Sequence, residues 1–366
     1  MYKNPYVCAV NYQACETDPY NSLHIFNSLG CNSGNMLFSE AIYRGIKGAR
    51  RGIYTFKPKH IADADCIVIS AANWINSFED FGQLANRLEA TTLPVITVGL
   101  GAQAETNRTY PTLQKGTLRL LKLLSERSTA ISVRGEYSAE VLAHYGIHNA
   151  MITGCPSALL IGRKTAFINR SSIIADRGCA LHASRNLFDA GNPLERYLYR
   201  QALGRQMDLV LQAEQPDIMV KLGTLPSDEE APFHHQILTW AYGADFETTL
   251  DYLADKGRFF REYDKWITYL STRHFAFGTR LHATIAALIA GTPATLITHD
   301  TRTAETALAM HLPTVEARDI NLDRPLRLVD YYDDEKLTRF EQHYPTYRRN
   351  FEFFFHLNGL EMITPS

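Results

Sequence analysis

The sequence lacks any apolar run long enough to cross a membrane, and its first residues lack the apolar segment of an export signal. A transmembrane helix needs about 18 or more consecutive apolar residues, and a secretory signal carries a shorter apolar core near its start. Neither pattern occurs in the 366 residues. We therefore expect a cytoplasmic protein without a transmembrane segment. A peripheral position at the inner face of the cell membrane stays open, because the aromatic and basic segment at residues 347–355 suits either a membrane surface or packing within the fold.

Cysteine is scarce, and the six cysteines form no CxxC pair. Cys66 lies in an apolar run, which suits a reduced, buried thiol and agrees with a cytoplasmic location. Cys155, next to Pro156, is a candidate nucleophile only if a histidine or asparagine assists it. No such partner can be identified from spacing, so a packing role is favoured.

Neither sign of charge is in clear excess, since 37 lysines and arginines stand against 39 aspartates and glutamates. This balance gives no general attraction to nucleic acid, and no nucleic-acid partner is expected. Around residues 280–302 the sequence also lacks HExxH, paired cysteines and an Asp-x-Asp run. We therefore expect no metal and no other cofactor.

Short apolar runs alternate with helical segments, a pattern typical of α/β folds with parallel sheets. The chain exceeds the usual size of one hydrophobic core. We expect two Rossmann-like domains, residues 1–165 and 166–330, and a helical segment, residues 331–366, that packs back across the domain boundary. The expected strands are residues 66–70, 94–99, 130–133, 151–154, 179–182, 218–220, 275–277 and 294–297, and the expected helices include 114–125, 137–145, most of 233–270 and 333–357.

The segment at residues 277–293 has the pattern of an anion site. Thr279 is predicted to be the N-cap of a helix and Gly291 the residue that follows its end. Arg280 and His282 then lie in the first turn, where free backbone N–H groups and the helix dipole favour a phosphate. A helix that only packs on a sheet would explain the alanines of this segment. It would not explain an arginine and a histidine at the carboxyl end of a strand, where α/β sheets bind ligands.

Other polar residues follow expected strands or precede expected helices. Arg134 either holds a carboxylate or phosphate or pairs with Glu136 or Glu140. Gly99 and Gly101 permit close backbone approach, although the full GxGxxG pattern is missing. The candidate ligand-binding residues at these positions are Asn35, Asn73, Gly99, Gly101, Arg134, Asp300 and Arg302.

The turn at residues 30–35 and the pair Asp300 and Arg302 are further candidates for ligand binding. The turn at residues 30–35 either offers its backbone and Asn35 to a sugar hydroxyl or is a simple Asn/Gly turn. Asp300 and Arg302 bring an acid and a cation to the sheet edge that carries Arg280 and His282. Several cations beside helix N-termini suit a ligand that bears both a phosphate and a carboxylate.

With these motifs in view, the chain resembles the polysaccharide pyruvyl transferase family over roughly residues 20–310. The resemblance implies two Rossmann-like domains facing across a cleft, as in GT-B glycosyltransferases. It also implies transfer of a pyruvyl group from phosphoenolpyruvate to two hydroxyls of a hexose unit, with release of phosphate. The implied acceptor is a glycan or its precursor, either free or lipid-linked, on the side of the first domain. The matching elements are Gly30–Asn35, Asp65–Ser70, Gly99-Leu100-Gly101, Ser132–Ser138 running to Gly154, Arg280-Leu281-His282 with Gly291-Thr292-Pro293, and Asp300–Glu305.

The resemblance assigns roles to some of these residues and leaves others unassigned. Arg280, Leu281 and His282 are implied as phosphoenolpyruvate contacts on the second domain, with Arg280 and His282 catalytic. The roles of Asp300 and Arg302 are not settled by it. Gly34-Asn35 stands where many relatives have Gly-Asp, so an acid there is absent and His282 becomes the candidate proton donor.

The sequence also permits two other functions. A nucleotide-sugar glycosyltransferase of GT-B type would hold a diphosphate at the Arg280 helix start. A non-catalytic anion- or sugar-binding protein of envelope biosynthesis would follow if the residues that replace the family pattern at Asn35 and Asn73 had removed catalysis.

Overall fold

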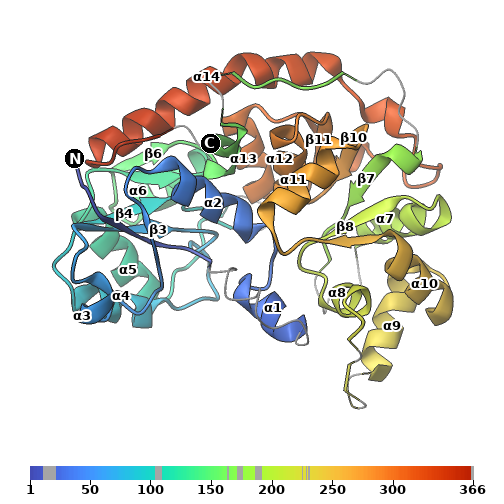
Figure 1. Ribbon diagram of the computed structural model, residues 1–366, viewed down its shortest axis with the longest axis horizontal. Coiled ribbons are helices and arrows are strands. Elements are labelled where there is room, and N and C mark those ends of the chain that lie inside the picture. The colour runs from blue at the N-terminus through green and yellow to red at the C-terminus, as the bar shows by residue number, and fades with distance from the viewer. Residues whose placement is uncertain are drawn as a thin grey trace.

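The computed structural model describes residues 1–10, 22–103, 109–162, 165–170, 176–185, 192–224, 226–227, 229 and 231–363. Its strands form a four-stranded and a six-stranded parallel sheet that lie side by side, with helices around both, and a two-stranded parallel pair (Figure 1). The inner strands of the sheets are almost fully buried and mostly apolar, as expected where helices cover both faces of a parallel sheet, whereas edge strands such as residues 50–52 and 314–316 are partly exposed. The expected α/β class, with two Rossmann-like units in a GT-B-like arrangement, is confirmed.

The first sheet has the strand order β2-β1-β3-β4, and all its pairs are parallel. A further parallel pair, β5-β6, joins it through a bridge between Leu100 and Val133. Its elements are β1 (Pro5–Cys8), α1 (Ser22–Ser28), α2 (Asn35–Gly45), β2 (Arg50–Gly52), α3 (Pro58–Ile61), β3 (Cys66–Ser70), α4 (Gly82–Glu89), β4 (Val95–Val98), α5 (Lys115–Glu126), β5 (Ile131–Val133), α6 (Glu136–His144) and β6 (Ala150–Ile152).

The second sheet has the order β12-β11-β10-β7-β8-β9, again with parallel pairs. Between the sheets runs the 3-10 helix η2 (Pro156–Ile161). The elements of this half are β7 (Cys179–His182), α7 (Pro193–Gly204), β8 (Asp208–Leu211), α8 (Gln215–Lys221), α9 (Ala231–Tyr242), α10 (Phe246–Lys256), β9 (Gly257–Phe259), α11 (Tyr263–Ser271), β10 (Phe275–Gly278), α12 (Leu281–Ile289), β11 (Ala294–Thr298), α13 (Thr301–Met310), β12 (Thr314–Glu316) and α14 (Asp334–Leu357).

One expected strand was wrong. Residues 218–220 lie in helix α8, and the strand of this region is β8, ten residues earlier. Pro216 stands in the first turn of α8, where proline starts a helix readily. An apolar run of three residues does not distinguish a strand from the buried side of a helix. The helical stretch between 233 and 270 is present, but β9 interrupts it.

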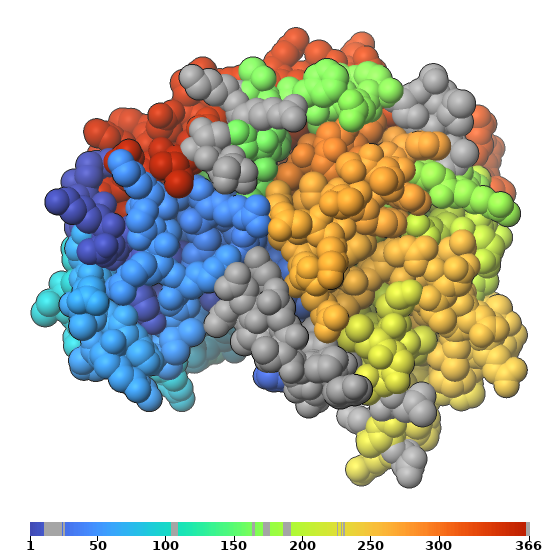
Figure 2. Space-filling model, in the orientation of Figure 1, coloured from blue at the N-terminus to red at the C-terminus, as the bar shows by residue number. Residues whose placement is uncertain are grey.

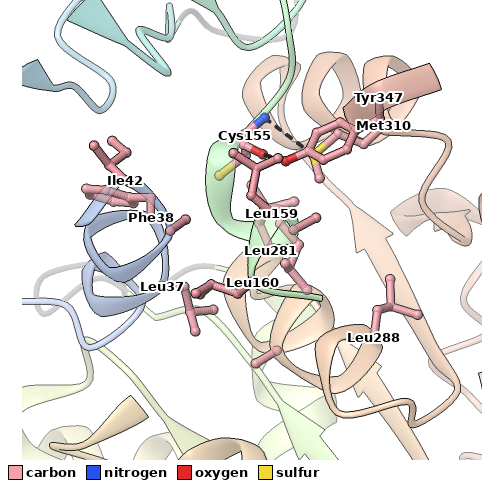
Figure 3. Packing of buried hydrophobic residues seen from close by; sticks show 14 of the residues in the cluster. Leu37, Phe38, Ile42, Cys155, Leu159, Leu160, Leu281, Leu288, Met310 and Tyr347 are labelled. Carbon is pink, nitrogen blue, oxygen red and sulfur yellow. Dashed lines mark hydrogen bonds between the residues drawn. The ribbon is translucent and has the colours of Figure 1, made fainter. Parts of the chain in front are cut away.

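The two halves share one apolar core. Helix η2 packs between α2 and α12, and Figure 3 shows Leu37 and Phe38 of α2 beside Leu159, Leu160 and Leu281. On the face shown in Figure 2, residues coloured blue meet residues coloured orange. An example of contact between the halves is Arg44, whose guanidinium lies 4.7 Å from the centre of the Tyr263 ring. The facing sheets are therefore held together by packing as well as by the chain.

Helix α14 runs along the molecule past both sheets (Figure 1). The hydroxyl of Tyr347 donates a 2.6 Å hydrogen bond to the carbonyl of Cys155, and Tyr344 donates to Ala158 at 3.2 Å. Just past the helix, the Asn358 side-chain oxygen accepts from the backbone N–H groups of residues 129 and 130. These contacts tie the C-terminal helix to the first half. The division of the chain at residues 165 and 330 stays a prediction.

Candidate active site

The carboxyl ends of the two sheets meet at the loop before α2. The backbone N–H of Ser33 donates to the carbonyl of Gln212, just after β8, at 2.9 Å. At Gly34 a side chain would meet the second half directly, because an added Cβ would lie 2.7 Å from Gln212 Oε1 and 2.8 Å from His282 Nδ1. Gly34 therefore permits a close approach of the two halves, and it brings His282 next to α2.

The start of α12 differs by one residue from the sequence expectation. Arg280, not Thr279, is the N-cap, and His282 is the second residue of the helix. The Thr279 hydroxyl is already engaged, since it accepts the backbone N–H of Ser184 at 2.7 Å. Gly291 follows the helix end with a φ of 77°, as expected for the residue after a C-cap.

Arg280 is held by partners that the sequence did not reveal. Its guanidinium forms an ion pair with Glu214 through Nη2, and Nε donates to the carbonyl of Ala183 at 3.4 Å. Burial lowers the pKa of Arg280, but the charge and hydrogen bond of Glu214, together with the charges of Tyr199 and Glu195, outweigh this effect and the pKa is raised overall. The side chain keeps 14% of its exposure, whereas that of Glu214 is fully buried. Arg280 is thus a fixed cation at the sheet edge.

His182, at the end of β7, holds the backbone in place at the start of α12. Its Nδ1 accepts the backbone N–H of Arg280 at 3.1 Å. Complete burial, together with the charge of Arg280, lowers the pKa of His182 to about 3. His182 is therefore neutral near pH 7 and acts as an acceptor. Sequence reasoning included it only as part of a strand, and its position at the strand end was the available signal.

Arg134 is almost fully buried at the end of β5, with 2% of its surface exposed. Its Nε donates to the Gly99 carbonyl at 2.8 Å and its Nη1 to Asn73 Oδ1 at 3.2 Å. Neither Glu136 nor Glu140 forms an ion pair with it among the described residues. Burial lowers the pKa of Arg134, and the charge of Arg302 acts in the same direction. Arg134 is therefore anchored by neutral groups and keeps its positive charge uncompensated by a direct ion pair.

The glycine pair supports Arg134. Gly99 has a φ of 75°, which favours glycine, and its N–H donates to Ser132 Oγ at 2.9 Å. An added Cβ at Gly101 would lie 3.0 Å from Arg134 Cδ, and the Gly101 N–H donates to Ala72 O. Both N–H groups are used inside the protein. Gly101 thus makes room for Arg134 and the Gly99 carbonyl accepts its hydrogen bond, and neither glycine presents its amide to a ligand.

His282 lies among three arginines. Burial lowers its pKa well below 6.5, and the charges of Arg134, Arg302 and Arg280 lower it further. Its ring lies 5.6 Å from that of Phe38. His282 is neutral in the ligand-free protein at pH 7.

Cys155 has the histidine neighbour that spacing did not reveal. Its Sγ lies 3.7 Å from His282 Nε2 and 3.2 Å from Ser157 Oγ. The thiol is fully buried, and Figure 3 shows it beside Met310 and Tyr347. The histidine that a nucleophilic thiol would need is therefore present, and the packing role of Cys155 stays a prediction.

Asp300 is the N-cap of α13. Its Oδ1 accepts the backbone N–H of Thr303 at 2.7 Å, and Oδ2 lies 3.4 Å from Arg302 Nη2. Burial raises its pKa, but Arg302 and the other partners lower it more. The Nε of Arg302 is buried and has no hydrogen-bond partner in the described part of the chain. Glu305 binds the Ser138 backbone N–H at 2.9 Å and so links α13 to the start of α6.

Asn35 is held within its own turn, where Nδ2 donates to the Leu29 carbonyl at 3.0 Å. Asn35 also lines a cavity of about 450 Å³ at the edge of the first sheet. A larger cavity of about 950 Å³ lies beside Asp300 and Leu308, and Arg134, Arg280 and His282 do not line it. Neither lining includes Arg134, Arg280 or Arg302, but Arg134 Cζ lies 5.9 Å from the ring of Phe38, which lines the smaller cavity.

Within the described ranges no group of three or more His, Cys, Asp or Glu residues could hold a metal ion. No described helix combines the length and the apolar character that spanning a membrane requires.

Sequence reasoning missed Gln212, Glu214 and His182 at this edge. The wrong strand at 218–220 hid the first two, because the correct strand, β8, places them directly after its carboxyl end. With β8 assigned, the rule that ligands bind at such ends would have drawn attention to both.

Three solved structures are distantly similar to this chain. The S. aureus MnaA-UDP co-structure is 12% identical, with a TM-score of 0.45, 99% of this chain and 99% of that chain covered. A putative UDP-N-acetylglucosamine 2-epimerase from Listeria monocytogenes is 12% identical, with a TM-score of 0.47 and coverage of 100% and 98%. The wall teichoic acid polymerase TagF is 12% identical, with a TM-score of 0.40 and coverage of 86% and 77%. Likeness at this level does not extend to function.

No curated protein matches the sequence significantly. The family model described as polysaccharide pyruvyl transferase matches residues 15–301. The matched span contains the loop before α2, Arg134, Arg280 and His282. The chain therefore belongs to the polysaccharide pyruvyl transferase family.

Proposed function

We propose that this protein transfers the pyruvyl group of phosphoenolpyruvate to two hydroxyls of a hexose unit in a glycan, forming a cyclic ketal and releasing phosphate. The observation that carries the proposal is the cluster of Arg134, Arg280 and Arg302 around His282 at the start of α12. Phosphoenolpyruvate bears a phosphate and a carboxylate. Several fixed cations and a helix N-terminus suit both groups.

In the proposed reaction, the methylene carbon of the donor gains a proton as the first acceptor hydroxyl attacks C2. The second hydroxyl then attacks C2, and the C2–O bond to phosphate breaks. Of the two hydroxyl protons lost, one is balanced by the new methyl hydrogen and the other by the released phosphate. A positioned proton donor and cations beside the leaving phosphate are the two demands of this chemistry.

His282 is the proposed proton donor. In the free protein its pKa is lowered by burial and by the three arginines. A bound phosphate and carboxylate would offset those positive charges and raise this pKa again. Donor binding would thus create the protonated form that the reaction needs. Arg280 and Arg134 would hold the two anionic groups, with the leaving phosphate at the helix start.

The test is direct incubation of the protein with phosphoenolpyruvate and a panel of methyl hexopyranosides. Phosphate release is followed by a colorimetric assay, and the ketal methyl group by proton NMR. We expect phosphate and ketal in equal amounts. Release of a nucleotide from a parallel panel of nucleotide sugars, with no reaction of phosphoenolpyruvate, would instead establish a glycosyltransferase. Binding of anions without turnover of either donor would establish a binding protein.

A further inference from the structure

The cavity lined by Asn35 and Trp74 has the features of a carbohydrate subsite. Its volume of about 450 Å³ lies within the range of roughly 300–1,000 Å³ found for small-molecule sites. It opens at the carboxyl ends of β1 and β3, where the first sheet is expected to bind ligands. The cavity is separate from the larger one beside Leu308.

Aromatic rings form one wall of this cavity. Trp74 is only partly buried, and its ring lies 5.0 Å from that of Phe81 and 6.3 Å from that of Tyr54. The Tyr54 hydroxyl donates to the carbonyls of Cys8 and Ser70, so this ring is fixed from behind. Two packed neighbours thus hold Trp74 as a rigid apolar surface, which can bind a flat partner with little loss of side-chain freedom.

Polar groups surround the aromatic wall. Ser70, which is 3% exposed, lines the cavity, and its hydroxyl has no hydrogen-bond partner in the described part of the chain. A buried hydroxyl without a partner is uncommon in folded proteins and suggests a group that a ligand completes. At the rim, Gln83 and Arg87 of α4 are exposed and also line the cavity. An apolar platform with a few polar groups suits a molecule with one apolar face and a hydroxylated edge.

The cavity adjoins the arginine cluster through Phe38 and Asn73. Phe38 lines the cavity, and its ring lies 5.6 Å from the His282 ring and 5.9 Å from Arg134 Cζ. Asn73 precedes Trp74 in the chain and accepts a hydrogen bond from Arg134. A ligand resting on Trp74 would therefore have its free edge next to the groups proposed to hold the donor.

We propose that this cavity is the acceptor subsite, with the apolar face of a hexopyranose ring stacked on Trp74 and its hydroxyls directed past Phe38 toward His282. The proposal rests on the proposed function, because only pyruvyl transfer makes a sugar bound here the second substrate. It adds the residues that bind the sugar: Trp74 as the platform, and Ser70 and Gln83 as hydrogen-bonding groups. A nucleobase would also stack on a tryptophan, and the test therefore includes uridine monophosphate as a competing probe.

The experiment compares wild type with Trp74→Ala, Trp74→Phe and Gln83→Ala. The probes are methyl hexopyranosides of glucose, galactose, mannose and N-acetylglucosamine, followed by saturation-transfer NMR and by the Michaelis constant for the best acceptor. Loss of the stacking platform should raise this constant about tenfold in Trp74→Ala, with partial recovery in Trp74→Phe. Gln83 is exposed on α4, so Gln83→Ala tests the rim without disturbing the packing of Trp74.

Two matched controls separate the subsite from general damage. Trp240→Ala removes a partly buried tryptophan of α9 that stacks with Arg196 in the second half. Leu308→Ala changes the wall of the larger cavity at a residue that is 72% exposed. Both control variants should have the wild-type Michaelis constant for the acceptor. Phosphoenolpyruvate binding, measured by calorimetry, should be unchanged in all five variants.

The outcomes distinguish the two proposals. The subsite would be overturned, and pyruvyl transfer left standing, by either of two results. One is an unchanged Michaelis constant for the acceptor in both Trp74→Ala and Gln83→Ala. The other is a rise in that constant confined to Leu308→Ala. Binding of uridine monophosphate, but of no hexopyranoside, at Trp74 would also overturn it. Hexopyranoside binding that disappears in Trp74→Ala, in a protein that never consumes phosphoenolpyruvate, would support the subsite and refute the proposed function.

Discussion

Replacing Arg280 with alanine should lower the free energy of unfolding of the protein and also impair catalysis. Arg280 and Glu214 form an ion pair in which the arginine side chain is 14% exposed and the glutamate is fully buried. Removing the arginine would leave a buried carboxylate without its counter-ion. Breaking such a pair from one side costs about 3–5 kcal/mol of unfolding free energy. Sequence reasoning, without Glu214, would have predicted an intact fold.

The double variant Arg280→Met with Glu214→Gln separates the two effects. It removes both charges and fills similar volumes, so most of the stability should return. The fixed cation would still be missing, and turnover should remain about 10²–10³-fold below wild type. Urea unfolding followed by circular dichroism gives the stability, and phosphate release gives the activity. An Arg280→Ala protein with the wild-type urea midpoint would refute the ion pair, and a double variant with wild-type turnover would refute the catalytic role of Arg280.

Four further predictions follow from the site. His282→Gln should keep phosphoenolpyruvate binding but lose most turnover, and the fall of kcat with rising pH that we assign to the protonated imidazole should vanish; near-normal turnover with an unchanged profile would assign His282 to packing. His182 has a pKa of about 3 in the folded protein against 6.5 when unfolded. Its contribution to the free energy of unfolding is therefore fully present above pH 6.5 and falls by roughly 1.4 kcal/mol per pH unit as the pH drops from 6.5 toward 3. Urea unfolding at pH 7 and pH 5 should show this slope in wild type and a shallower one in His182→Asn, and equal slopes would contradict the assignment. Glu305→Ala should cost about 1–3 kcal/mol, because Ser138 loses the acceptor of its buried N–H; an unchanged urea midpoint would argue against this link between α13 and α6. Chelation with EDTA should leave turnover unchanged, and a loss that a divalent ion restores would show that the proposed metal-free donor site is wrong.

The sequence by itself determined many of the elements and some of their ends. Alternating apolar runs identified β3, β5, β10 and β11, because a strand buried on both faces must be apolar along its length. Gly291 identified the end of α12, since glycine readily adopts the positive φ found there. These signals are local, and each depends on a few neighbouring residues.

The tertiary structure decided which of these residues meet and what charge each one faces. Arg134 and His282 come from different sheets, and only the close approach at Gly34 and the shared core around η2 bring them together. The partner of Arg280 depended on β8, which the sequence pattern misplaced. Contacts between residues that are far apart in the sequence produce no periodic pattern in it. Burial and neighbouring charge, which fix the pKa of His282, are therefore properties of the folded protein alone.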